Sequence, residues 1–176
     1  MLIEIPLIQK FILLLGQPVY SVAALLFSLL IGAGTGSWIS GFIWQSRTLL
    51  KLRISVTAVS LLTGLYILFL NHIFTYFLGM PFFIRLVLSF CLVFPLGFFL
   101  GMPFPLGMKL LDEFGLQQHV PRMWGVNGIG SVLGSTLSIA LAVSFGFSYA
   151  MLLGALLYIS LFISTFLLRV DGLENP

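Results

Sequence analysis

The sequence has few charged residues. Of its 176 residues, 7% are Asp, Glu, Lys or Arg, and only 5 are acidic. Because a soluble domain carries about 25% charged residues, this composition excludes a water-soluble globular protein. It also excludes most polar catalysis, which needs several convergent ionisable groups. We therefore expect no catalytic residue in this chain.

Cysteine is equally scarce. Cys91 is the only cysteine, and it lies in the apolar segment 86–93, so the sequence holds no disulfide framework and no metal-ligand spacing. We expect Cys91 to be a small buried side chain. His72 and His119 are expected in loops without a second ligand nearby. We therefore expect neither a metal site nor a cofactor in this chain.

Long apolar segments dominate the sequence instead, and 60% of the residues are hydrophobic. A helix needs about 20 apolar residues to cross a bilayer. Segment 1–16 contains Glu4, Gln9 and Lys10 and reaches only about 24 Å. It is either interfacial or re-entrant, or it is the end of a longer helix that begins outside this sequence. The segments predicted to span the membrane are 20–44, 54–70, 82–111, 124–145 and 149–168.

These segments predict an all-α fold, a polytopic transmembrane helical bundle with five full spans and one short N-terminal segment. Residues 1–176 are expected to form a single membrane domain, with a polar tail at 170–176. One span should be kinked or broken near the sequence GMPFPLG, because proline removes a backbone donor. The prolines expected to disturb this helix are Pro95, Pro103 and Pro105.

The basic residues are dispersed between the apolar segments, so we expect no binding to nucleic acid. Six of the eight Lys and Arg residues fall on one predicted side of the membrane, and Arg85 falls on the other. Because Lys and Arg concentrate in cytoplasmic loops, we expect this side and the C-terminus to be cytoplasmic. The six are Arg47, Lys51, Arg53, Lys109, Arg122 and Arg169.

Two glycine clusters, GAGTG at 32–36 and GIGSVLG at 128–134, look like nucleotide-binding loops. A dinucleotide fingerprint, however, requires a preceding strand and an acidic ribose partner, and both clusters lie within apolar segments. Small residues spaced by four instead form a smooth stripe where two helices approach closely. We expect this packing role for Gly32, Gly36, Gly97, Gly101, Gly130 and Gly134.

Polar residues at membrane depth are functional candidates, because placing them there costs a few kcal/mol unless they face protein or water. Asn127 and Ser131 share one face of a predicted helix, although serine hydroxyls also bond to their own helix. Arg122 precedes Trp124 and is either an interface anchor or part of a site for an anionic group. The candidates are Glu4, Gln9, Lys10, Arg122, Asn127 and Ser131.

Three blocks of the sequence carry a resemblance to a known family: LIQKFILLLGQPVYSVAALLFSLLIGAGTGSWISG, GMPFPLGMKLL and WGVNGIGSVLGSTLSIALAVSFGFSYAMLLGALLY. They resemble the membrane portion of the large bacterial spermidine synthase-like membrane proteins. In that family, transmembrane segments are fused to a Rossmann-type domain similar to polyamine aminopropyltransferases. No position of this chain matches the synthase motifs, so the resemblance supplies no catalytic residue.

The resemblance implies that the chain is a fragment of a larger protein of the bacterial inner membrane. Its expected function is to anchor or feed a soluble aminopropyltransferase or S-adenosylmethionine-type domain that lies outside this sequence. The helical layout also resembles half of a major-facilitator transporter, which gives the alternative of a half-transporter for a small solute. A purely structural subunit is the third possibility. The expected partners are the lipid bilayer and either a synthase-like domain or a second membrane half.

Overall fold

The computed structural model describes residues 1–42 and 47–167, and these residues form helices and no strands. The predicted all-α helical bundle is confirmed. The predicted polar tail, 170–176, and Arg169 lie outside the described residues. The helices are α1 (Glu4–Leu15), α2 (Pro18–Phe42), α3 (Thr48–Phe77), α4 (Phe82–Leu100), α5 (Pro103–Glu113), the 3-10 helix η1 (Gln117–His119), α6 (Val120–Phe145) and α7 (Phe147–Leu167).

Five stretches of the described chain are helical, long and apolar enough to cross a membrane. The chain therefore has the architecture of a multi-pass membrane protein. One helix is longer than predicted: α3 extends to Phe77, so His72 lies in that helix and not in a loop. Its side chain is exposed and does not interrupt the backbone. The five stretches are Pro18–Gly41, Thr48–Phe77, Phe82–Glu113, Gln117–Phe145 and Phe147–Phe166.

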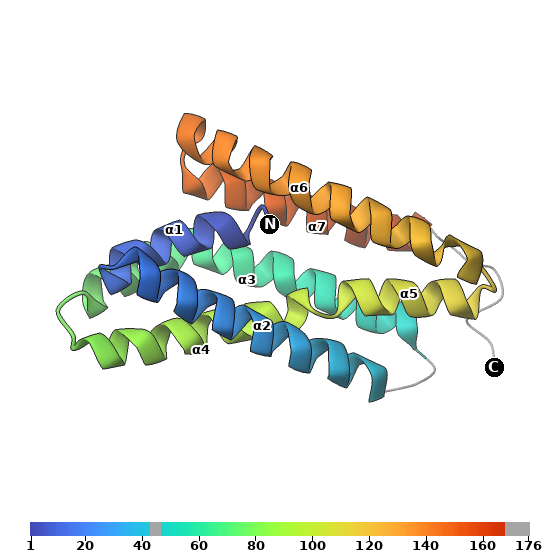
Figure 1. Ribbon diagram of the computed structural model, residues 1–176, viewed down its shortest axis with the longest axis horizontal. Coiled ribbons are helices and arrows are strands. Elements are labelled where there is room, and N and C mark those ends of the chain that lie inside the picture. The colour runs from blue at the N-terminus through green and yellow to red at the C-terminus, as the bar shows by residue number, and fades with distance from the viewer. Residues whose placement is uncertain (43–46, 168–176) are drawn as a thin grey trace.

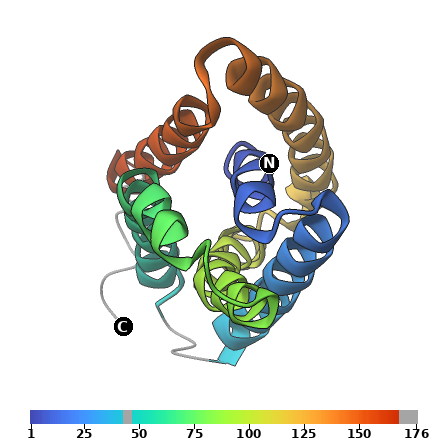
Figure 2. The same ribbon diagram turned by 90° about the vertical axis from the view of Figure 1, so that its left-hand side faces the viewer.

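The long helices surround α1, which lies in the middle of the bundle (Figures 1 and 2). At one end of the bundle, here named the α5 end, α5 ends and α3 and α6 begin. At the opposite end, here named the α1 end, α1 is followed by α2 and α3 by α4. Helix α1 runs from the middle of the bundle to the α1 end and occupies only part of its length.

Apolar packing and polar bonds hold α1 in this central position. Leu7, Phe11 and Leu14 have no exposed surface, and the Phe11 ring meets the Phe74 ring edge-on at 4.9 Å. Arg85 Nη1 on α4 donates a hydrogen bond to the Leu14 carbonyl oxygen at 2.7 Å, which satisfies a helix-end acceptor. The first segment is thus an interior helix and not an interfacial one.

A glycine makes the turn out of α1 possible. Gly16 follows the last residue of α1 with a φ of 79°, and its N–H donates to the Ile12 carbonyl oxygen at 2.8 Å. This left-handed conformation is favourable for glycine and costly for other residues. It reverses the chain within two residues, so that α2 begins at Pro18 and packs beside α1.

The predicted break in the fourth apolar segment falls at one place only. Helix α4 ends at Leu100 and α5 begins at Pro103. Pro95 lies inside α4, which continues through it, and Pro105 lies in the first turn of α5. The break predicted near GMPFPLG is therefore confirmed, whereas the expectation that Pro95 breaks the helix was wrong. A proline in a first helical turn removes a donor that has no partner within the helix, which explains why α5 accepts Pro105.

Cys91 is exposed on α4, so the prediction that it is buried was wrong. In a soluble protein, an apolar run such as 86–93 would mark the core. In a bilayer, both the lipid-facing and the interior sides of a helix are apolar, so hydrophobicity does not indicate which side a residue faces.

Helices α2 and α4 cross with their backbones in close proximity. A Cβ atom added to Gly32 would lie 2.6 Å from the Phe94 carbonyl oxygen, and one added to Gly97 would lie 2.9 Å from the Leu29 carbonyl oxygen. Gly36 and Gly101 are closer still to the opposite backbone. At these four positions, the interface between α2 and α4 therefore has room for a hydrogen atom but not for a side chain.

The substitution Gly36→Ala is expected to lower the free energy of unfolding by about 1–3 kcal/mol. The new Cβ would clash with the Phe98 carbonyl oxygen, which belongs to backbone and cannot rotate away. Denaturation of the purified protein in mixed detergent micelles measures the change. Gly34→Ala is the matched control, because a Cβ on Gly34 meets nothing within 4 Å. Equal losses for both variants would contradict the close α2–α4 crossing.

Candidate functional site

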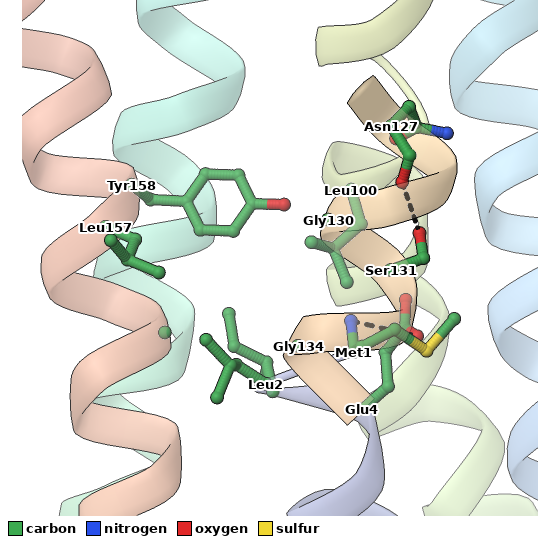
Figure 3. A pocket seen from close by; sticks show the side chains of 12 residues that line it. Met1, Leu2, Glu4, Leu100, Asn127, Gly130, Ser131, Gly134, Leu157 and Tyr158 are labelled. Atoms are coloured by element: carbon green, nitrogen blue, oxygen red, sulfur yellow. Dashed lines mark hydrogen bonds and ion pairs between the residues drawn. The ribbon is translucent and has the colours of Figure 1, made fainter. Parts of the chain in front are cut away.

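A cavity of about 240 Å³ lies in the bundle interior, where α1 begins. Residues at the start of α1, the end of α4, and the middle of α6 and α7 line it (Figure 3). The lining residues are Met1, Leu2, Ile3, Glu4, Leu100, Asn127, Gly130, Ser131, Gly134, Gly154, Leu157 and Tyr158.

The polar groups of the cavity come from three helices. Asn127 and Ser131 lie one turn apart on α6, and Ser131 Oγ donates a hydrogen bond to the Asn127 carbonyl oxygen at 2.8 Å. The phenol of Tyr158 extends from α7 into the cavity (Figure 3). Glu4 contributes a carboxylate from α1, and its Oε2 lies 3.3 Å from the amino nitrogen of Met1. The cavity therefore presents one carboxylate that is paired with the Met1 amino group, one amide and two hydroxyl groups.

Three of the sequence-predicted candidates, Glu4, Asn127 and Ser131, are thus brought together at one site. Gln9 is exposed on α1 and is not among the lining residues. Arg122 is exposed in the first turn of α6 and also lies outside the cavity. The neighbouring Trp124 packs edge-on against Phe104 of α5 at 4.8 Å, which ties the start of α6 to α5.

The small residues of α6 have a different role from the one predicted. Gly130 lines the cavity, and a Cβ added there would meet nothing within 4 Å, so the expectation that it packs against a helix was wrong. Gly134 also lines the cavity, and its Cβ would reach Met1 at 3.4 Å. Because glycine has no side chain, both positions leave more space around Glu4. Gly154 on α7 is the more crowded position, because a Cβ added there would lie 2.6 Å from Cγ1 of Ile3.

Tyr158 and Gly154 of α7 were missed by the sequence analysis. The position of Tyr158 in the sequence could have indicated the site, because tyrosine in a membrane helix usually lies at the membrane–water interface. Here it lies in the interior of α7, which runs from Phe147 to Leu167. A tyrosine so far from either helix end indicates a polar partner or a cavity nearby.

Lys10 lies apart from the cavity. Its side chain is 5% exposed, and among the described residues its Nζ has no hydrogen-bond partner. Ser138 on α6 is likewise buried with an unpartnered hydroxyl. Buried polar groups without partners are costly, and a buried ammonium group more so than a hydroxyl. Lys10 therefore reduces the stability of the bundle.

The described residues contain no group of three or more His, Cys, Asp or Glu side chains that could hold a metal ion. No protein-family model, curated protein or solved structure matches the chain.

Replacing Lys10 with methionine is expected to raise the free energy of unfolding by about 1–3 kcal/mol, because it removes an unpaired buried donor and keeps the side-chain volume. The same detergent-micelle denaturation measures it. Arg122→Met is the control, and as an exposed residue it should change the value by less than about 0.5 kcal/mol. A loss of stability in the Lys10→Met variant would show that the ammonium group has a favourable partner.

Proposed function

We propose that this chain is the membrane domain of a spermidine synthase-like membrane protein, and that it takes a small polar solute into its interior for a soluble transferase domain. The observation that carries the proposal is the polar cavity at the start of α1. A simple anchor needs apolar helices, but it needs no cavity in which a carboxylate, an amide and two hydroxyl groups converge. The resemblance of the three sequence blocks supports the family assignment.

The charge of the site favours a cationic solute. Glu4 is the carboxylate among the lining residues, and a charge in a membrane interior is stable only when it is paired or hydrated. An amine of the kind that aminopropyltransferases use would compete with the Met1 amino group for Glu4. Asn127, Ser131 and Tyr158 would then supply oxygen acceptors for its N–H groups.

The proposal also includes an orientation in the bacterial inner membrane. Arg47, Lys51, Arg53, Lys109 and Arg122 all belong to the ends of helices that meet at the α5 end, whereas Arg85 lies near the α1 end. Because basic residues concentrate on the cytoplasmic side, the α5 end faces the cytoplasm. A soluble transferase domain would then receive the solute from that end.

Spermidine is expected to raise the thermal unfolding midpoint of the detergent-purified chain, because a ligand of the folded state adds about 2.7 kcal/mol at one hundred times its Kd. Glu4→Gln should abolish this increase. Glu113→Gln is the matched control, since Glu113 is a carboxylate at the end of α5, bonded to Thr48 at 2.5 Å, and this variant should retain the increase. Putrescine, neutral sugars and amino acids are tested in the same way as alternative solutes. The absence of a specific increase with every solute would leave the chain as an anchor and overturn the proposal.

A half-transporter is the second candidate function, and the discontinuity between α4 and α5 favours it. Interrupted helices line the substrate sites of many transporters, because their free backbone groups face the substrate. Leu100, the last residue of α4, lines the cavity, so the interruption lies beside the site.

The half-transporter predicts uptake of labelled solute into proteoliposomes that contain this chain alone. Asn127→Ala should abolish uptake, because it removes a cavity amide. Thr136→Ala on the exposed side of the same helix should leave uptake unchanged. Solute binding without uptake would favour the membrane-domain function, and uptake sensitive to Asn127→Ala would favour the half-transporter.

A further inference from the structure

A second cavity, of about 350 Å³, adjoins the one at Glu4. The two share Leu100 of α4, Asn127 of α6, and Leu157 and Tyr158 of α7. The second cavity is lined in addition by Pro103, Phe104 and Leu161. Cavities that share residues from three helices are neighbouring spaces within one interior.

The additional residues of the second cavity indicate the direction in which it extends. Pro103 and Phe104 are the first residues of α5, and Leu161 follows Tyr158 by nearly one turn toward the C-terminal end of α7. All three therefore lie on the side of the α5 end. In the opposite direction, α1 occupies the interior, and its Leu7 and Phe11 have no exposed surface.

Tyr158 lies at the junction of the two cavities. Figure 3 shows its phenol extending from α7 across the space toward α4 and α6. The buried apolar side chains are also divided into two clusters at this level of the bundle. One apolar cluster surrounds α1, and a smaller one joins Leu52, Val56 and Leu106 of α3 and α5. In the described part of the chain, Tyr158 is the one side chain that packs against both clusters.

We propose that the two cavities are compartments of one water-accessible passage from Glu4 to the α5 end, and that the Tyr158 side chain is the constriction between them. The break between α4 and α5 contributes to the passage, because Leu100 and Pro103 on its two sides both line the second cavity. This inference deepens the proposed function by giving a route to the same site. It concerns access to the site and does not depend on which solute binds.

Cysteine labelling in vesicles tests the passage. Cys91 is the only cysteine of the chain, so a Cys91→Ser background gives single-cysteine variants. The probe is a membrane-impermeant, positively charged methanethiosulfonate reagent, added to the face from which Arg122→Cys is labelled. Ser131→Cys in the inner compartment should react, whereas the adjacent Val132→Cys on the exposed side of α6 should not, because lipid would cover it.

The constriction is tested by a second substitution at Tyr158. Tyr158→Ala should increase the labelling rate of Ser131→Cys about tenfold, which corresponds to a barrier lower by about 1.4 kcal/mol. The labelling rate of Leu161→Cys, on the outer side of Tyr158, should not change. Tyr158→Leu, which keeps an apolar side chain in both clusters, serves if the alanine variant does not fold.

Two results would overturn the inference. Failure to label Ser131→Cys in either the Tyr158 or the substituted background would exclude a passage from the α5 end. Equal labelling rates in both backgrounds would exclude Tyr158 as the constriction. Neither result depends on solute binding, so a failure of the passage is distinguishable from a failure of the spermidine experiment.

Discussion

The central position of α1 is the constraint from which the other features of this bundle follow. Its side chains Leu7, Phe11 and Leu14 have no exposed surface, so α1 fills the interior toward the α1 end. The cavity at Glu4 lies where this helix begins, and its walls on α6 and α7 include Gly130, Gly134 and Gly154. Because glycine has no side chain, these walls contribute little volume, and the cavity is bordered by the few polar side chains that lie between the glycines.

Different interactions hold the helices together at the two ends of the bundle. At the α1 end, apolar side chains of α1 fill the interior, and Arg85 binds the last turn of that helix. At the α5 end, polar side chains join neighbouring helices. Lys51 of α3 donates to the Ser40 carbonyl oxygen of α2 at 2.9 Å, and Arg53 of α3 donates to the Thr165 carbonyl oxygen of α7 at 3.0 Å. The sequence analysis used these basic residues only to predict the cytoplasmic side, but they also connect helices. These two hydrogen bonds join α3 to α2 and α7, whereas Gln117–Phe145, which contains α6, is the least buried of the five spanning stretches.

The sequence predicted the fold class and the five spans well, because apolar length is a strong signal in a membrane protein. Its polar candidates Glu4, Asn127 and Ser131 lie together at one cavity. It could not predict which face of a helix is interior. Lipid and protein interior are both apolar, so Cys91 was placed on the wrong side. The sequence predicted the break near GMPFPLG, but it could not predict that Pro95 leaves α4 continuous. The position of a break depends on packing against neighbouring helices, which restores or withholds partners for the freed backbone groups.

The distribution of rigid contacts explains why the free space lies next to α6 and α7. Helices α2 and α4 are held backbone to backbone by four glycines, and a crossing this close leaves no room for a cavity between them. Helix α3 packs extensively against α7 and also contacts α4 and α5. Helix α6 touches mainly α7 and α1, so its polar face, with Asn127 and Ser131, is opposite the unfilled interior instead of another helix. Ser131 bonds to its own helix, whereas the Asn127 amide borders the cavity, and hydrocarbon would offer it no hydrogen bond. The loose packing of α6 and the polarity of its inner face thus have the same cause, because this helix faces the cavity and not another helix.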